Sequence, residues 1–186
     1  MRIIAGKFRG KILAKSDHLK SLRPTTDKNR QALFNILSSA QFIREIGFKI
    51  DGANILDLCC GSGAVAFESL SRGAKSALLI DNNHAHLELA KKNSQILKVE
   101  KDVKILCADA KNLPKNEEFF DLIFIDPPYA EDYSKIINSL LENGWIKKDS
   151  LIVVESSEPE KFIFKNFILL DLRRYGETSF AFLQLA

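Results

Sequence analysis

Two short segments carry the residue types that suggest chemistry. The first, Asp126-Pro-Pro-Tyr129, joins a carboxylate, carbonyl groups and an aromatic ring in a backbone that two prolines stiffen. A rigid set of acceptors beside a ring suits a planar exocyclic amine, because the acceptors hold its N–H bonds while the ring stacks on the base. An inert loop that ends a strand is the alternative interpretation of these four residues.

The second segment, Gly61-Ser-Gly63, follows a strand-like run and opens a helical pattern. Its glycines let the backbone bend sharply and let a ligand approach without a Cβ in the way. A P-loop is excluded, because no Lys-Ser/Thr pair follows. The spacing up to Ala66 fits a dinucleotide turn, and Asp81 is placed to grip ribose hydroxyls. Such a turn serves a nicotinamide or flavin cofactor as well as S-adenosylmethionine, so it does not decide between them.

Both segments lie in an alternation of strand and helix patterns that begins at residue 53. The strand-like runs cover residues 53–58, 77–80, 103–107, 120–125, 151–155, 167–172 and 179–185, and the helical runs cover 63–72, 83–97 and 133–142. This alternation predicts an α/β fold with a mostly parallel, seven-stranded sheet and helices on both faces. The last two strands are joined by RRYGET, which is too short for a crossover helix, so we expect an antiparallel hairpin there. Both chemical segments then face one crevice beyond the carboxyl ends of the strands.

The charge of the chain is unevenly distributed. Residues 1–50 hold 11 Lys/Arg against 3 Asp/Glu, whereas residues 51–186 hold 16 against 21. Such an asymmetry is typical of a polyanion-binding arm joined to a catalytic or binding domain. We expect a basic hairpin and extended arm over residues 1–25, and one α/β domain, with its leading helix, over residues 26–186.

The N-terminal part has its own pattern of elements. Short strand-like runs at residues 2–5 and 11–14 flank GKFRG and predict a small β-hairpin. Residues around Pro24 are expected to be extended, and one helix is predicted from about residue 26 through residue 46.

Composition excludes several other classes of protein. The three cysteines, Cys59, Cys60 and Cys107, are too few and wrongly spaced for a disulfide framework or a zinc site, so we expect reduced, buried thiols. We expect the histidines to lie on the surface and to bind no metal: His18, His84 and His86. No apolar run approaches the ~20 residues that span a bilayer. No signal-peptide pattern opens the chain, so a cytoplasmic location is expected.

With this motif and this alternation of elements, the chain resembles the amino-group methyltransferases that carry the (Asp/Asn/Ser)-Pro-Pro-(Tyr/Phe/Trp) motif on a Rossmann-like, class I fold. Within that group it resembles the RsmD family, and the match is carried by RIIAGKFRGKIL, LRPTTDKNRQALFNIL, DLCCGSGAVAFESLSRGA, DPPY and ENGWIKKDSLIVVESS. The resemblance implies methyl transfer from S-adenosylmethionine to the exocyclic N2 of a guanine in 16S ribosomal RNA. Cys59 and Cys60 stand where the family usually has Phe-Ala, so we expect altered packing there.

The resemblance also implies a role for each matching residue. The cofactor would be bound by Asp57, Gly61, Gly63, Asp81, Asp109 and Ala110. Asp109 would accept from the adenine amino group, although acids just beyond strand ends are also common as surface residues. Asp126 and the Pro127 carbonyl would hold the target amine, and Tyr129 would stack on the extruded base.

The basic residues of the N-terminal part are the candidates for phosphate contacts: Arg2, Lys7, Arg9, Lys11, Arg23, Lys28 and Arg30. Any single one can be an ordinary solvated charge, and Arg23 can instead reach the active site. The expected partner is small-subunit ribosomal RNA or the assembled small subunit, with no membrane, and a monomer is expected.

Four alternatives are less favoured. A DNA adenine-N6 methyltransferase would need a target-recognition domain for which 186 residues leave no room. A protein glutamine methyltransferase normally has Asn in place of Asp126. A nicotinamide-dependent oxidoreductase would leave the Asp-Pro-Pro-Tyr loop without a role, and no Tyr-x-x-x-Lys pair follows the fourth strand. A non-catalytic RNA-binding module would need neither the cofactor elements nor the amine-binding elements.

Overall fold

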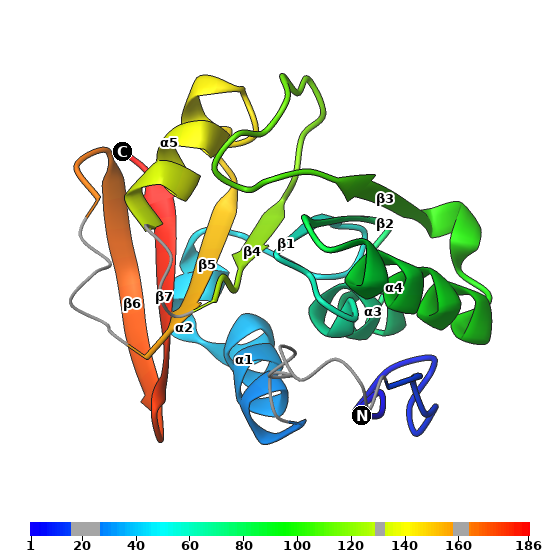
Figure 1. The fold of residues 1–186 in the computed structure, drawn as a ribbon. Helices are drawn as coiled ribbons and strands as arrows, with labels where there is room; N and C mark the ends of the chain where they lie inside the picture. The colour runs from blue at the N-terminus through cyan, green and yellow to red at the C-terminus, as the bar shows by residue number, and fades with distance from the viewer. Residues whose placement is uncertain (16–26, 129–132, 158–163) are drawn as a thin grey trace.

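In the described residues, seven strands form one sheet with the order β3-β2-β1-β4-β5-β7-β6 (Figure 1). The computed structural model describes residues 1–15, 27–128, 133–157 and 164–186. The strands are β1 (Asn54–Leu58), β2 (Ser76–Asp81), β3 (Val103–Cys107), β4 (Leu122–Ile125), β5 (Leu151–Ser156), β6 (Phe167–Tyr175) and β7 (Thr178–Leu185). Strands β1 to β5 run parallel, and β7 pairs antiparallel with both β5 and β6. The predicted α/β class, with its mostly parallel sheet and C-terminal antiparallel hairpin, is confirmed.

Helices cover both faces of this sheet. Their bounds are α1 (Asp27–Ser39), α2 (Gln41–Glu45), α3 (Ala64–Ser71), α4 (His84–Leu97) and α5 (Tyr133–Glu142), with a 3₁₀ turn, η1, at Glu100–Asp102. Alternate residues of a strand point to opposite faces. Leu151 and Val153 of β5 pack in the core that includes α1 to α4, whereas Ile152 and Val154 pack in the core that includes α5. Because both faces of β4 and β5 are covered, the sequences of these strands are almost continuously apolar.

The helix predicted through residue 46 is two helices. Ala40 takes an extended conformation, with φ −65° and ψ 147°, between α1 and α2. The hydroxyls of Ser38 and Ser39 donate to backbone carbonyls of the preceding turn, those of Phe34 and Asn35. Serine side chains that bond to the backbone in this way bend or weaken a helix, which accounts for the break after this pair.

The N-terminal segment, residues 1–15, packs on α3. The predicted hairpin is reduced to a single antiparallel bridge between Arg2 and Ile12. The carboxylate of Glu68 on α3, which is fully buried, accepts the backbone N–H groups of Ile4 and Ala5 at 2.8 and 3.0 Å. The Lys7 N–H donates to the Ser71 carbonyl at 2.7 Å. Across the bridge, the Ile3 N–H donates to the Lys11 carbonyl at 3.0 Å and the Leu13 N–H to the Met1 carbonyl at 3.1 Å, so the predicted hairpin is present but short, and its turn side is bonded to α3.

Gly6 shows how closely the segment approaches α3. It has a positive φ of 80°, and a Cβ built there would lie 1.8 Å from the Ser71 carbonyl oxygen. A side chain at this position would therefore push the segment off the helix. The predicted boundary between arm and domain falls within residues 16–26, outside the described residues, so that division stays a prediction.

The C-terminal strands extend further than predicted. β6 continues through Tyr175 and β7 begins at Thr178, so most of the RRYGET connection is strand and the turn is centred on Gly176. Residues in the β6–β7 turn reach the carboxyl ends of the parallel strands, where they meet the start of α1. The Asn29 side chain donates to the Thr178 hydroxyl at 2.9 Å. Among the described helices, none has the length and apolar character that crossing a membrane requires.

Candidate active site

Four carboxylates lie along the carboxyl ends of four neighbouring strands. In the order of the sheet they are Asp81 of β2, Asp57 of β1, Asp126 directly after β4, and Glu155 of β5. Residues two positions apart in a strand point to the same face of the sheet. The residues two positions before Asp81, Asp57 and Asp126 are Leu79, Ile55 and Phe124, and all three belong to the core beneath α1 to α4. Glu155 follows the same rule after Val153. All four acids therefore point to one face of the sheet.

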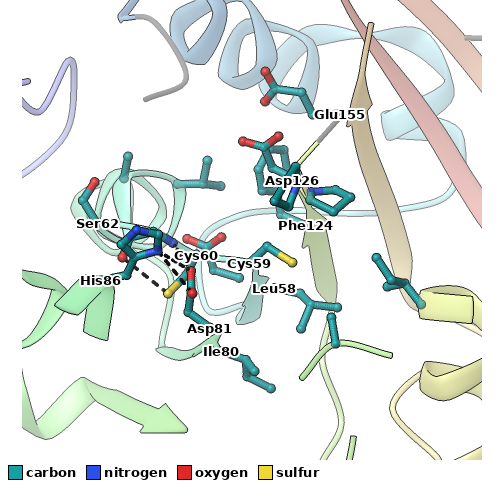
Figure 2. Close-up of a pocket in the computed structure, with 18 of the residues that line it drawn as sticks. Leu58, Cys59, Cys60, Ser62, Ile80, Asp81, His86, Phe124, Asp126 and Glu155 are labelled. Atoms are coloured by element: carbon teal, nitrogen blue, oxygen red, sulfur yellow. Dashed lines mark hydrogen bonds and ion pairs between the residues drawn. The ribbon is translucent and has the colours of Figure 1, made fainter. Parts of the chain in front are cut away.

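This row borders a cleft of about 1120 Å³. Its walls come from the glycine turn after β1, the ends of β2 and β3, the start of α1 and the β6–β7 turn. In Figure 2 the labelled side chains of Asp81, Asp126 and Glu155 line successive parts of this space. The two predicted chemical segments thus open into one crevice, as the strand alternation implied.

The glycine turn donates two backbone N–H groups to β2, one to a carbonyl and one to a side-chain carboxylate. The Cys60 N–H donates to the Ile80 carbonyl at 3.0 Å, and the Gly61 N–H donates to Asp81 Oδ2 at 2.9 Å. Gly61 lines the cleft, whereas Gly63 is not among the lining residues. A Cβ at Gly63 would lie 2.5 Å from Leu79 and 2.6 Å from Phe67. Gly63 therefore allows α3 to pack closely on the sheet, and the structure does not place it on the cleft wall.

Asp57 is a buried acid at the floor of the cleft. It is 2% exposed, and its Oδ2 accepts the Ala66 N–H at the start of α3 at 3.0 Å. Burial raises the pKa of the Asp57 carboxyl to about 8, and the charges of Asp126 and Asp81 act in the same direction against the lowering effect of the Ala66 bond. A cationic ligand in the cleft would favour the ionised form of this group.

Asp81 is held by three neighbours. Its carboxylate accepts the N–H groups of Gly61 and Asn83, both at 2.9 Å. His86 Nδ1 lies 3.2 Å from each Asp81 oxygen (Figure 2). The prediction that His86 lies on the surface is wrong, because its position one turn into α4 brings the ring over Asp81 and into the lining of the cleft. His84 is exposed as predicted, and His18 lies outside the described residues.

Asp109 and Ala110 line the cleft beyond the end of β3. Asp109 is exposed, and its Oδ1 accepts the Lys111 N–H at 2.9 Å, which closes a small turn. Ala110 is buried beneath it. The structure therefore brings this predicted pair to the cleft, at the β3 end of the row of acids.

Asp126 and Pro127 lie opposite the glycine turn. The Asp126 N–H donates to the Leu58 carbonyl at 3.3 Å, which fixes the start of the motif beside the end of β1. Asp126, Pro127 and Pro128 all line the cleft, and Asp126 is partly exposed to it. Tyr129, the predicted stacking ring, lies outside the described residues.

Glu155 and Arg174 are cleft residues that the sequence interpretation missed. Glu155 is 8% exposed at the end of β5, and Arg174 is exposed near the β6–β7 turn. A signal for Glu155 was present, because LIVVE ends an apolar strand in an acid, as ALLID and LIFID do. No local signal marks Arg174, since its approach to the cleft depends on where the hairpin folds back.

The predicted cysteine environment is only partly correct. All three thiols are free, but Cys60 alone is buried, whereas Cys59 is partly exposed and Cys107 is exposed. Burial raises the pKa of the Cys60 thiol well above its ordinary value. Cys59 lines the cleft and has a positive φ of 62°, a backbone conformation that residues other than glycine rarely adopt. Residues with such strained backbones cluster at functional sites.

The predicted phosphate contacts fall into four groups. Exposed side chains of the N-terminal segment form the first: Arg2, Lys7, Arg9 and Lys11. Lys28 is also exposed, and it lines the cleft from the first turn of α1. Arg23 lies outside the described residues.

Arg30 lies inside the protein and not on its surface. It is 1% exposed, and its Nη2 donates to the Arg2 carbonyl at 2.6 Å and to Asp27 at 2.9 Å, while its Nε lies 3.7 Å from the buried carboxylate of Glu68. The prediction that Arg30 contacts phosphate is wrong, because the acid on α3 draws this cation into the protein. Its charge helps to anchor the N-terminal segment.

Comparison with known proteins agrees with this geometry. The family model described as "Conserved hypothetical protein 95" matches residues 1–184. The "Ribosomal RNA small subunit methyltransferase D" of Haemophilus influenzae is 33% identical over 99% of this chain and 93% of that protein. The protein of the same name from Escherichia coli strain K12 is 36% identical over 84% of this chain and 74% of its own length.

A solved structure is also similar over its whole length. The Escherichia coli protein yhhF, described as a candidate methyltransferase, superposes with a TM-score of 0.78 at 32% identity, covering 100% of this chain and 97% of that one. The glycine turn, the acid-Pro-Pro motif and the sheet order therefore occur together with a family match over nearly the whole chain. The chain belongs to the RsmD family of methyltransferases, the family of the model "Conserved hypothetical protein 95".

Proposed function

We propose that this protein transfers a methyl group from S-adenosylmethionine to the exocyclic N2 amino group of a guanine in small-subunit ribosomal RNA. One observation carries the proposal: the acid-Pro-Pro motif after β4 and the glycine turn after β1 open into one cleft across which four acids are aligned. The relatives named for methylation of small-subunit ribosomal RNA support the substrate class.

The residues of the β1–β2–β3 side fit S-adenosylmethionine. Asp81, fixed by two backbone N–H groups, directs a carboxylate into the cleft where two vicinal ribose hydroxyls would need acceptors. Asp57 is a buried acid with a raised pKa, and a cationic ligand beside it would favour its ionised form and so lower that pKa. Asp109 and Ala110 would hold the adenine. When bound, S-adenosylmethionine supplies a methyl group on a positively charged sulfur.

On the β4–β5 side, Asp126 and the Pro127 carbonyl would hold the target amine. A guanine amino group delocalises its lone pair into the ring, so it is a weak nucleophile until acceptors hold its N–H bonds and favour a pyramidal nitrogen. These two acceptors would bring the nitrogen to the ~3–3.5 Å of a near-attack geometry. After transfer the nitrogen carries a positive charge and loses its proton readily, to Asp126 or to water. Positioning and electrostatic stabilisation then supply most of the rate.

The target base must leave its surroundings to reach this cleft. Tyr129, which follows the two prolines in the sequence, is proposed to stack on the extruded base. The exposed cations of the N-terminal segment would hold phosphates, and Lys28 and Arg174 would continue that positive path to the mouth of the cleft. Met1 adjoins the cleft, since Ser62, a lining residue, lies 3.8 Å from its sulfur.

The wider setting is part of the same proposal. The substrate is the RNA itself or the assembled small subunit. Because that substrate lies in the cytoplasm, we expect the protein there as well. The division into a basic arm over residues 1–25 and a methyltransferase domain over residues 26–186 follows the distribution of charge. We expect the protein to act as a monomer.

The test uses small ribosomal subunits that lack the modification. The protein is incubated with them and with methyl-labelled S-adenosylmethionine, and the labelled nucleotide is mapped. Label at N2 of one guanine is expected, and Asp126→Ala is expected to abolish it, while Asp149→Ala, an exposed acid far from the cleft, is the control. Label on DNA, on adenine or on protein, or full activity in Asp126→Ala, would overturn the proposal.

A further inference from the structure

Glu155 is the one acid of the row for which neither the cofactor nor the target amine gives a role. It lines the cleft at the end of β5, next to Asp126 in the order of the sheet. We propose that Glu155 selects guanine by accepting the hydrogen bond of its N1–H, beside the amino group that Asp126 holds. This inference rests on the proposed function and names the residue that determines which base is accepted.

The register of the sheet places the two acids side by side. Strands β4 and β5 are parallel, with Ile125 opposite Val154, so the next residue of each strand, Asp126 and Glu155, lies at the same level. Neighbouring strands are about 4.8 Å apart, and residues at one level of parallel strands point to the same face. In Figure 2 both side chains extend into the same part of the cleft.

The chemistry of the guanine edge matches this pair of acceptors. Guanine presents two adjacent donors there, N1–H and the N2 amino group, and two neighbouring carboxylates can accept from both. Adenine presents an unprotonated N1 beside its amino group, so a carboxylate at the Glu155 position would face a lone pair. A site built to accept a hydrogen bond rejects an analogue that lacks the donor far more strongly than an apolar pocket rejects a wrong shape.

The Glu155 side chain is 8% exposed, in a cleft wall that also holds Asp126 and the buried Asp57. Acidic side chains that gather in a cleft concentrate at functional sites.

The backbone around Glu155 is rigid, as a selecting residue requires. The Tyr133 hydroxyl at the start of α5 donates to the Glu155 carbonyl at 3.3 Å. On its other side Glu155 pairs with Phe180 of β7, and Phe180 is fully buried. The acid therefore projects from the last part of a strand that is still paired with β7, so its position does not depend on a loop.

The decisive experiment changes the base and the acid together. Small-subunit RNA is prepared with guanine, 2-aminopurine or 6-thioguanine at the target position, and kcat/KM is measured for the wild type and Glu155→Gln. 2-Aminopurine keeps the amino group but lacks both N1–H and O6. 6-Thioguanine keeps N1–H and has sulfur in place of O6, so it controls for the loss of O6. Glu142→Gln, at an exposed glutamate that ends α5 and does not line the cleft, is the matched control.

The wild type is expected to prefer guanine over 2-aminopurine by about 100-fold or more and to accept 6-thioguanine. Glu155→Gln should lower that preference at least about tenfold, because an amide can donate to the bare N1 of 2-aminopurine. Glu142→Gln should keep the wild-type preference.

Equal use of guanine and 2-aminopurine by the wild type would overturn the inference, and this comparison needs no variant to fold. Equal losses on both bases in Glu155→Gln would also overturn it, since they indicate a structural role. If the wild type does not methylate the guanine RNA at all, the proposed function itself fails, which is a separate outcome.

Discussion

The two sides of the cleft differ in what holds their acids. On the cofactor side, the carboxylates of Asp81 and Asp57 accept backbone N–H groups from the glycine turn and from the first turn of α3. On the substrate side, the described bonds that position Asp126 and Glu155 include main-chain ones: the Asp126 N–H donates to the Leu58 carbonyl, and the Glu155 carbonyl accepts the Tyr133 hydroxyl. The first pair of acids is part of the fold as well as of the site.

This difference predicts two kinds of variant. A substitution on the cofactor side should change folding stability and ligand affinity together, because the acid loses backbone partners. A substitution on the substrate side should change the rate or the choice of base and leave folding and cofactor binding nearly intact.

Asp126→Ala should lower the rate of methyl transfer about 1000-fold, because one of two acceptors for the target amine is lost, and single electrostatic contacts at a reacting centre contribute roughly 10²–10³ in rate. Single-turnover kinetics with saturating cofactor measure the loss. Affinity for S-adenosylmethionine and the melting temperature should stay near their wild-type values. A variant that also lost cofactor affinity would remove the distinction between the two sides.

Asp57→Asn should change how stability depends on pH. The pKa of Asp57 is raised to about 8, so between pH about 4 and 8 the folded protein keeps a proton that the unfolded chain has lost. The free energy of unfolding of the wild type therefore falls as pH rises through this range and levels off above it, by an amount on the order of a few kcal/mol.

Removal of the titrating group should flatten that dependence and make Asp57→Asn more stable than the wild type near pH 8. Urea unfolding at pH 5, 6.5 and 8 measures both proteins, with Asp149→Asn as a control for the loss of an exposed acid. The same slope in Asp57→Asn as in the wild type would show that another group is responsible.

Asp81→Asn should weaken cofactor binding about 10- to 100-fold, because hydrogen bonds to a charged acceptor contribute roughly 1.5–3 kcal/mol. Calorimetric titration with S-adenosylmethionine measures the affinity. The melting temperature should fall as well, since the Gly61 and Asn83 N–H groups lose a charged acceptor. Unchanged affinity would mean that Asp81 serves the turn alone.

Charge reversal of Arg9 and Lys11 should weaken RNA binding and leave cofactor affinity nearly unchanged. Both side chains are exposed on the N-terminal segment. Loss of two phosphate contacts should reduce the slope of log affinity against log salt by about two. Charge reversal of Lys91 and Lys92 on α4 makes the same change in net charge and should have a smaller effect. Equal loss of RNA and cofactor binding would indicate that the segment has a structural role.

Much of the fold follows from local patterns in the sequence. The strand at residues 103–107 and the helix at 133–142 have the bounds that the sequence predicted. The break after Ser39 was missed, because serine pairs are compatible with a helix until their hydroxyls bond to its carbonyls. The N-terminal hairpin is present but shorter than predicted, and its backbone also bonds to an acid on α3 that no local pattern reveals.

The site was predictable where chemistry and local structure coincide. Asp57, Gly61, Asp81 and Asp126 each lie at the end of a strand or in the turn after it, and the structure places all four on the cleft. Arg30 was misjudged as a phosphate contact, because nothing near it in the sequence reveals the buried Glu68 that draws it inward. An ion pair between residues far apart in sequence leaves no trace in the periodicity of either helix.

The sequence by itself determined the parallel sheet, the glycine turn and the acid-Pro-Pro motif, because each depends on residues within a few positions of one another. Tertiary structure alone decided which strands are neighbours, and so brought Glu155 beside Asp126 and the glycine turn beside Asp81. The lateral order and register of strands are set by packing across the whole sheet. They therefore fix the neighbours of a carboxylate in ways that no short stretch of chain can encode.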